Sequence, residues 1–262
     1  MTHPNRFSKT IALAILPLAL GMYWLLAHAS IADMDDQPPG YVSAVEMSNY
    51  DVSSGSSVIY RGDFFRGNWD GNLIAHKVDS SGGTTVTWQA RAVLATQSWD
   101  FGRKIFTMNG TSGVPFRWNT TLTRLTMIAA QQSVLGGDPQ GRHLLEFTRG
   151  NGAYEGTTFR QRFSKLGDII HSRPYYVNYG SGVERVYVGA NDGMLHAFDA
   201  TNGKEVFAYI PSMLIPKLSQ FAVNPYTNHK YGVDGLLSIA DLTRGTAKLK
   251  LCLLYTSDAA DE

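Results

Sequence analysis

Cysteine is almost absent from the chain, since Cys252 is the only one among 262 residues. A single thiol can build neither an internal disulfide framework nor the paired thiolates of a zinc or redox motif. The segment Cys252–Glu262 (CLLYTSDAADE) also resembles the in-frame translation of a sequencing-library adapter, and such scars are excluded from fold reasoning. We therefore predict an authentic part that ends at Leu251 and uses neither thiolate catalysis nor cysteine-bound metal.

The sequence also lacks a surplus of charge of either sign. Its 23 basic and 22 acidic side chains give a formal net charge of +1. So mild a balance offers no electrostatic reason for binding to nucleic acid or to an anionic membrane surface. We predict neither of these partners.

Long apolar runs are absent except at the N-terminus. Ile11–Leu26 carries no charge, follows the basic residues Arg6 and Lys9, and precedes small residues around Ala29 and Ala32. This is the layout of a secretory signal, and the run is shorter than the roughly 20 residues that span a bilayer. We predict a signal peptide over 1–29, cleaved after Ala29 or Ala32, and no stable membrane span after its removal.

Short β-rich segments bounded by turn residues fill most of the remaining chain. Their aromatic and β-branched residues favour half-buried strands, and the tight turns between them favour antiparallel pairing. Residues 30–57 are polar with weak periodicity and are predicted to be a lead-in or linker. The predicted strands are Val58–Phe65, Asn72–Val78, Thr84–Ala90, Lys104–Met108, Val114–Trp118, Pro174–Asn178, Glu184–Gly189, Met194–Asp199 and Glu205–Ile210.

One region interrupts this pattern with helical spacing. Leu122, Leu125 and Ala129 recur at helical intervals within Thr120–Leu135, and His143–Thr148 is a second short candidate. We therefore predict a helical insertion near 120–148 inside a β domain that covers 58–251.

An internal repeat organises the strands. Gly67–His76 (GNWDGNLIAH) and Gly189–Phe198 (GANDGMLHAF) share Gly, Asp-Gly, Leu and Ala at one constant offset. A second glycine turn and a strand with an aromatic residue follow each copy, which is most of a β-propeller blade. Because the offset exceeds one blade of about 40–50 residues, we predict an intermediate blade that includes Lys104–Trp118.

The residues shared by the two copies are predicted to shape turns rather than to bind a ligand. A two-residue type I′ turn needs φ > 0 at both central positions, which Asp, Asn and Gly tolerate. No catalytic, cofactor-binding or metal-binding residue is predicted. The predicted blade-turn residues are Gly67, Asp70, Gly71, Gly189, Asn191, Asp192, Gly193, Asp199 and Gly203.

Two short motifs have a local structural explanation. Arg61-Gly62-Asp63 is a tripeptide that integrins bind, but the residues on both sides of it have strand character. Asp234-Gly235 is predicted to be another turn.

Scattered polar residues offer weaker hypotheses of a site. His171, His196 and His229 lack the spacing of a zinc motif and could bind metal only if the fold gathered them. Asp168 and Glu184 could act as an acid–base pair only if the fold placed them together.

Longer motifs resemble a known family. Leu166–Val177 (LGDIIHSRPYYV) and Arg185–Ser212 (RVYVGANDGMLHAFDATNGKEVFAYIPS) are similar to the C-terminal β-propeller of PilY/PilC-type proteins, the tip-associated adhesins and biogenesis factors of type IV pili. Glu146–Arg162, Arg103–Thr107 and His229–Leu242 extend the resemblance to roughly 58–251.

The resemblance implies an all-β fold, namely the N-terminal part of a propeller with quinoprotein-like blades and a short helical insertion. It implies an exported, non-enzymatic protein of the periplasm, outer membrane or pilus tip. Its expected partners are pilins, minor pilins and host surface ligands, and its expected roles are pilus assembly, retraction control and adhesion. The family's calcium loop alternates Asp or Asn around a central Gly, and no stretch here has that pattern. Calcium is therefore implied only for a longer protein, and no cofactor is predicted for this sequence.

Two other classes stay open as alternatives. Outer-membrane assembly scaffolds have similar repeats but are commonly lipoproteins anchored through a cysteine after the signal, where this chain has Ser30. Quinoprotein dehydrogenases resemble Ala197–Phe207 (AFDATNGKEVF), but such an enzyme also needs a quinone pocket and usually calcium.

Overall fold

The computed structural model describes residues 41–48, 55–65, 67–118, 127, 129–223, 229–244 and 247–254. The predicted signal peptide over 1–29 lies outside these ranges. None of the helices in the described ranges is both long and apolar enough to cross a bilayer.

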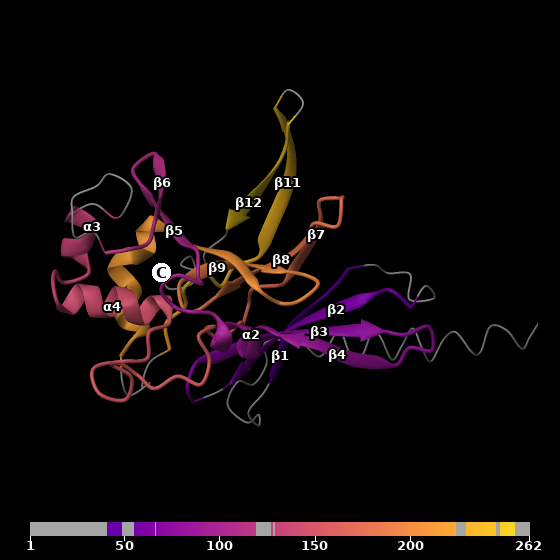
Figure 1. The fold of residues 1–262 in the computed structure, drawn as a ribbon, viewed down its shortest axis with the longest axis horizontal. Coiled ribbons are helices and arrows are strands. Elements are labelled where there is room, and N and C mark those ends of the chain that lie inside the picture. Colours follow the sequence, from indigo (N-terminus) through magenta and orange to yellow (C-terminus); the bar gives the residue numbers. More distant parts are fainter. Residues whose placement is uncertain are drawn as a thin grey trace, which may run out of the picture. The chain divides into compact units, whose positions relative to one another are not determined.

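The first sheet is an antiparallel meander of four consecutive strands (Figure 1). It consists of β1 (Tyr41–Met47), β2 (Val58–Phe65), β3 (Asp70–Val78) and β4 (Thr84–Gln89), paired in that order. Strand β1 lies inside the segment for which the sequence predicted only a lead-in. Its register shifts between Val42 and Ala44, and such a bulge breaks the alternation by which a strand is recognised.

The second sheet contains another four-strand meander. Its strands are β7 (Tyr175–Asn178), β8 (Glu184–Ala190), β9 (Met194–Asp199) and β10 (Glu205–Ile210). The hairpin of β5 (Ile105–Asn109) and β6 (Ser112–Pro115) extends this sheet, because β5 pairs in parallel with β10.

The predicted intermediate blade containing Lys104–Trp118 is therefore wrong. Its two strands belong to the second blade, next to β10. Among the described residues, the additional chain between the two copies consists of this hairpin, helices and connecting segments rather than four new strands.

Short helices separate the two meanders. They are α2 (Ala90–Thr96), α3 (Ala129–Val134) and α4 (Gln140–Arg149), and the 3-10 helix η2 (Ser212–Phe221) follows β10. Helix α4 contains the predicted helix His143–Thr148 and ends at Gly150, whose φ of 109° lies in the left-handed region. The predicted helix Thr120–Leu135 is described mainly from Ala129 onward, where α3 begins. Neither α2 nor η2 is predicted from the sequence pattern.

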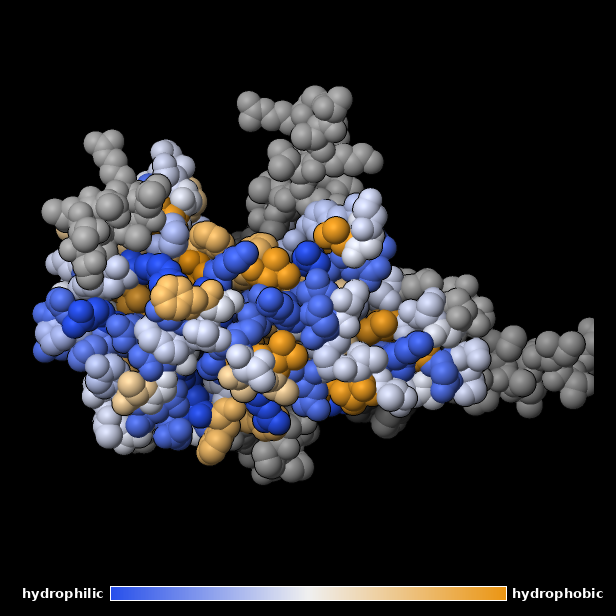
Figure 2. Space-filling model, viewed as in Figure 1, coloured by the Kyte–Doolittle hydropathy of each residue, from blue (hydrophilic) through white to orange (hydrophobic). Residues whose placement is uncertain are grey.

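Three apolar clusters hold these elements together. One joins the two meanders through Tyr60, Leu73 and Trp88 on one side and Val186 and Phe198 on the other. A second packs α4 and η2 against β5 and β10, which agrees with the adjacent helices α3, α4 and η2 in Figure 1. A third covers the other face of β8 and β9. On the face shown in Figure 2, apolar residues form small separate patches between polar ones.

A hairpin of β11 (Leu237–Arg244) and β12 (Ala247–Leu254) makes a third sheet. Strand β12 includes three residues of the predicted adapter tail, and Cys252 pairs with Ile239. The origin of that tail and the domain limits stay predictions. The predominance of antiparallel meanders, with few and short helices, agrees with the expected blades and helical insertion.

Candidate functional site

A segment around the LGD motif contacts three Asp-Gly motifs in succession. We call Phe163–His171 the strap. The Phe163 N–H donates to Asp70 Oδ2 at 2.6 Å, and the Gly167 N–H donates to Asp192 Oδ2 at 2.9 Å. The His171 N–H donates to Asp234 Oδ1, also at 2.9 Å. The three donors stand at equal intervals along the strap.

The third acceptor identifies a third copy of the repeat. Asp234-Gly235-Leu236-Leu237 has the Asp-Gly-x-Leu pattern of the two earlier copies and follows the second by about one blade length of roughly 40 residues. Asp234 is buried and stands just before β11. The sequence predicted a turn here, but the structure gives this aspartate a partner on the strap.

The first Asp-Gly pair is not the centre of a turn, which corrects the predicted geometry. Asp70 and Gly71 lie within β3, and the left-handed φ values belong to Gly67 (92°) and Trp69 (57°). The Gly71 N–H donates to Leu166 O at 2.9 Å. A Cβ atom on Gly71 would lie 2.0 Å from Gly167 O. Glycine is required here because the strap backbone approaches so closely.

The second pair does occupy a turn, but of a different kind. Asn191–Gly193 form a three-residue loop between the paired residues Ala190 and Met194. The Gly193 N–H donates to Ala190 O at 3.2 Å, and Gly193 alone in the loop is left-handed, with φ 89°. This is a loop with one left-handed residue rather than the predicted two-residue type I′ turn.

Of the remaining predicted turn residues, Gly203 and Gly189 make contacts between elements, whereas Asp199 closes its own turn. Gly203 is left-handed with φ 72°, and a Cβ atom there would lie 2.5 Å from the Trp88 ring. Asp199 Oδ1 accepts the Thr201 N–H at 3.0 Å within its own turn. Gly189 lies in β8, where its N–H donates to Ser172 Oγ at 2.8 Å.

A buried ionic network leads from the second Asp-Gly motif into the core. His196 contacts Asp192 through Nε2 at 3.1 Å and Glu205 through Nδ1 at 2.9 Å. Two Arg103 nitrogens, Nε and one of the Nη atoms, each donate to Glu205 at 2.7 Å. The side chains of Arg103, Glu205 and His196 are fully buried.

The charges in this network set the protonation of its members. Burial by itself lowers the pKa of His196, but the carboxylates of Asp192 and Glu205 outweigh burial and raise this pKa to about 9. Burial raises the pKa of Glu205, but Arg103 and His196 outweigh it and lower that pKa to about 2. His196 is thus an imidazolium held between two carboxylates at neutral pH.

Asp168 and Glu184 do not form an acid–base pair. Asp168 is buried, accepts the Asn191 Nδ2 donor at 3.2 Å and contacts His229 Nε2 at 2.7 Å. Burial raises the pKa of Asp168, while His229 and Asn191 oppose that rise. Glu184 starts β8 and hydrogen-bonds Tyr176 instead.

The three histidines are not gathered into a metal site. His171 pairs with Asp234, His196 belongs to the ionic network, and His229 pairs with Asp168. Within the described ranges, no group of three or more His, Cys, Asp and Glu side chains could hold a metal ion.

The integrin-type tripeptide lies in the middle of β2. Arg61 Nε donates to Asp63 Oδ1 at 2.9 Å, and Asp63 is only 4% exposed. This arrangement agrees with the structural explanation, because the acidic residue is paired and buried rather than presented on a loop.

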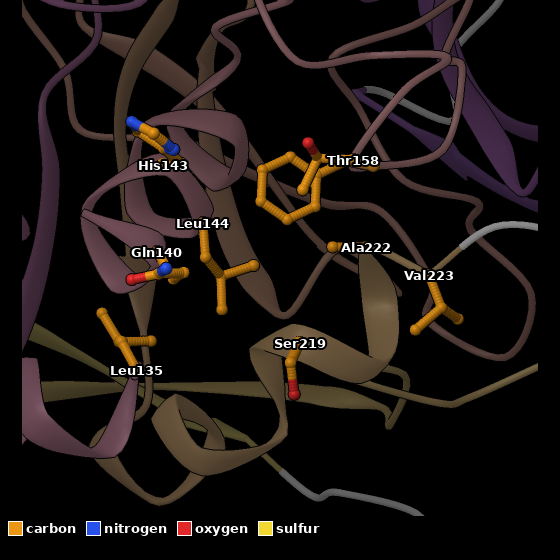
Figure 3. Close-up of a pocket in the computed structure, with 9 residues that line it drawn as sticks. Leu135, Gln140, His143, Leu144, Thr158, Ser219, Ala222 and Val223 are labelled. Atoms are coloured by element: carbon orange, nitrogen blue, oxygen red, sulfur yellow. The ribbon is translucent and has the colours of Figure 1, made fainter. Parts of the chain in front are cut away.

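A hollow of about 290 Å³ lies between α4 and the end of η2 (Figure 3). Gln140, His143 and Leu144 reach it from α4, opposite Ala222 and Val223. Among the described residues, no Asp, Glu, Lys or Arg lines it, so its chemistry suits an uncharged, mainly apolar group. A smaller cavity of about 20 Å³ beside Asp168 and His229 has room for about one water molecule.

Comparison with known proteins finds a family model and several relatives that match parts of this chain. Residues 166–260 match the family described as the PilY1 beta-propeller domain. The type IV pilus biogenesis factor PilY1 homolog of Xylella fastidiosa (strain Temecula1 / ATCC 700964) is 35% identical over 215 residues, covering 71% of this chain and 16% of that protein. PilY1 of Pseudomonas aeruginosa strain PAK is 36% identical over 221 residues, covering 69% of this chain and 18% of that protein. PilY1 of strain UCBPP-PA14 is 31% identical over 258 residues, covering 83% and 22% respectively.

These alignments span about a fifth of the length of the curated relatives. No solved structure matches the chain. The family match begins at Leu166 within the strap and includes the second and third Asp-Gly motifs. The resemblance found in the sequence is confirmed: the chain carries sequence of the PilY1 β-propeller domain and is a relative of the type IV pilus biogenesis factors named PilY1.

Proposed function

We propose that this chain acts in type IV pilus biogenesis as a protein-binding scaffold. The observation that carries the proposal is its similarity to proteins named type IV pilus biogenesis factors, over 69% to 83% of the chain. The antiparallel meanders, joined through a shared apolar cluster, support the proposal because they offer a rigid surface.

The arrangement of titratable groups favours binding over catalysis. Arg103, His196 and Glu205 are buried and paired with one another, so the network that they form has no member directed to a substrate. Asp168 and Glu184, the pair considered for acid–base chemistry, have separate partners. We therefore propose a non-enzymatic role.

The finer parts of the proposal follow the family resemblance. The expected partners are pilins and minor pilins, with host surface ligands as a second set. The expected roles are assembly, control of retraction and surface adhesion, by an exported protein at the outer membrane or pilus tip. Calcium is proposed only for a longer protein that contains the family's loop.

The test is deletion and complementation of the full-length gene. Surface pili are counted by electron microscopy, and adhesion to host cells is measured in parallel. We expect the deletion to remove surface pili and the full-length gene to restore them. Unchanged piliation and adhesion would contradict the scaffold role. A pull-down with minor pilins and a host-surface binding assay then separate an assembly factor from an adhesin.

The alternative of a quinoprotein dehydrogenase rests on Ala197–Phe207. In the structure this segment is formed by the second half of β9, a turn and the first half of β10, so its likeness concerns blade architecture. Absorbance of a bound quinone in the purified full-length protein would favour that enzyme. An outer-membrane assembly scaffold would instead be recovered with the partners of that pathway and would leave piliation unchanged when deleted.

A further inference from the structure

We propose that the strap sets the spacing of three consecutive repeats, and that the aspartate of each Asp-Gly-x-Leu motif fastens its repeat to the strap. This assigns positioning roles to Asp70, Asp192 and Asp234. The inference concerns how the fold is organised and does not depend on the proposed function.

The three contacts are chemically alike but come from different elements. Each joins a strap N–H to a carboxylate oxygen, at 2.6, 2.9 and 2.9 Å. Asp70 starts β3, Asp192 lies in the loop between β8 and β9, and Asp234 precedes β11. The side chains of Asp70 and Asp234 are 1% and 0% exposed. Hydrogen bonds to an ionised acceptor are among the stronger ones in proteins.

The strap backbone also pairs with the repeats. The Asp168 N–H donates to Trp69 O at 3.2 Å in the first repeat. The Asn191 N–H of the second repeat donates to Asp168 O at 3.0 Å. Both polar groups of Asp168's peptide backbone are thus used, one by each repeat, as buried backbone groups require.

The strap fits between the first two repeats only because it carries glycine at its centre. A Cβ atom on Gly167 would lie 2.3 Å from Asp192 N, while a Cβ atom on Gly71 would lie 2.0 Å from Gly167 O. The three backbones are in contact without intervening side chains. This close approach fixes the position of the strap along its length, so a shift by one residue is not accommodated.

Other aspartates in the repeats show that turn chemistry alone does not explain these three. Asp79 Oδ1 accepts the N–H groups of Ser81 and Gly83, both at 2.8 Å. Asp199 likewise accepts within its own turn. Each of the first two repeats therefore contains one aspartate that closes a local turn and another that accepts a hydrogen bond from the strap. The turn-closing aspartate is a matched control for the strap-binding one.

Hydrogen exchange of single amides in the full chain tests the proposal. We expect Asp70→Ala, Asp192→Ala and Asp234→Ala to speed exchange at Phe163, Gly167 and His171 respectively, by about 10- to 100-fold. The other two strap amides should keep their protection in each variant. Asp199→Ala should leave all three unchanged.

The corresponding Asp→Asn variants keep an oxygen acceptor and should give a smaller increase at the same single amide. They also serve where an alanine variant does not fold. The proposal is overturned if every aspartate variant exposes all three amides equally, if Asp199→Ala exposes them to the same extent, or if the asparagine variants leave exchange unchanged.

Discussion

The first and second repeats share a backbone plan but differ where their fourth strand ends. In both repeats, the pairing register between the third and fourth strands shifts at the same place. The shift lies between Ala75 and His76 of the third strand in the first repeat, and between Glu205 and Phe207 of the fourth strand in the second. This makes Trp88, opposite Ala75, the counterpart of Phe207. After that point β4 gives way to helix α2, whereas β10 continues to Ile210 and pairs with β5.

Side chains on the third strand explain the divergence. Asn72 Nδ2 donates to Gln89 Oε1 at 3.1 Å, and Asn72 Oδ1 accepts the Arg91 N–H at 3.0 Å in the first turn of α2. In the second repeat the corresponding position is Met194, which cannot make these bonds. A blade can therefore end in a helix or recruit another hairpin while its four-strand body is preserved.

The interiors of the two repeats differ in charge as well. Both aspartates contact the strap, but four residues later the first repeat has Ile74 and the second has His196. Burial raises the pKa of Asp70 to about 6, although Phe163 and Arg160 oppose that rise. Burial also acts on Asp192, but His196 and the Gly167 N–H outweigh it and lower its pKa. The strap contact lowers the pKa of both aspartates, so the opposite net shifts come from burial and from the neighbouring side chains.

The largest effect is expected from breaking the buried ionic network of Arg103, His196 and Glu205, which the first repeat lacks among its described residues. Arg103→Met leaves Glu205 buried without its guanidinium and should cost about 3–5 kcal/mol in the free energy of unfolding. Urea denaturation measures the change. The double variant Arg103→Met with Glu205→Leu should recover much of the loss, because no unpaired carboxylate then remains. A double variant as unstable as the single one would contradict this account.

The counterpart pair Trp88 and Phe207 gives the next comparison. Trp88 is 7% exposed and its Nε1 donates to Ala200 O at 2.9 Å, whereas Phe207 is only partly buried. Trp88→Ala should cost about 3–5 kcal/mol and Phe207→Ala clearly less. Thermal and urea unfolding of both variants provide the measurement. Equal losses would show that the two positions are more alike than their burial indicates.

The two repeats are expected to lose stability in different pH ranges. The pKa of His196 is raised from 6.5 to about 9 in the fold, so its stabilisation is complete below pH 6.5 and is lost as the pH rises through 9. The loss is on the order of 3 kcal/mol. The pKa of Asp70 is raised from 3.8 to about 6, so its contribution is greatest below pH 3.8 and declines as the pH rises through 6.

Urea midpoints across these two windows test the assignment. His196→Gln should remove the decline between pH 6.5 and 9, and Asp70→Asn should remove the decline between pH 3.8 and 6. A wild-type stability that increases from pH 6.5 to 9 would refute the imidazolium in the second repeat.

The smallest expected effect lies in the first repeat. The Arg61–Asp63 pair has an arginine side chain that is 33% exposed, so solvent screens much of its attraction. Arg61→Ala should cost no more than about 1 kcal/mol. Urea denaturation beside Arg103→Met provides the comparison, and a similar loss in the two variants would mean that exposure does not control these ion pairs.

The local sequence pattern was sufficient to predict most of the strands and the internal repeat. Val58–Phe65, Met194–Asp199 and Glu205–Ile210 are strands over the predicted residues. What the sequence did not reveal are contacts between distant backbone groups. The pairing of β5 with β10 has no side-chain signature, because both partners are main-chain groups. In each strap hydrogen bond the donor is a main-chain N–H, so the sequence around the accepting aspartate does not reveal its partner.

The site residues illustrate this limit. Turn chemistry accounted for Asp70 and Asp192 from their neighbours alone, yet their strap partners are 93 and 25 residues away. Two residues of the strap contacts could be recognised as candidates from the sequence. Asp234 repeats the Asp-Gly-x-Leu pattern, and Gly167 separates two chain segments rich in turn residues. The ionic network could not be inferred, because Arg103 and Glu205 are 102 residues apart.

The position of the strap in the chain imposes an order on folding. The strap follows the first repeat and precedes the second. Because the chain is synthesised with its N-terminus first, β3 is complete long before Phe163 is available to Asp70. The contact between the first repeat and the strap must therefore wait for a distant segment, which is a slow, non-local step. The later repeats, by contrast, are added to a strap that has already been synthesised. A chaperone that protects the early strands would act during that interval.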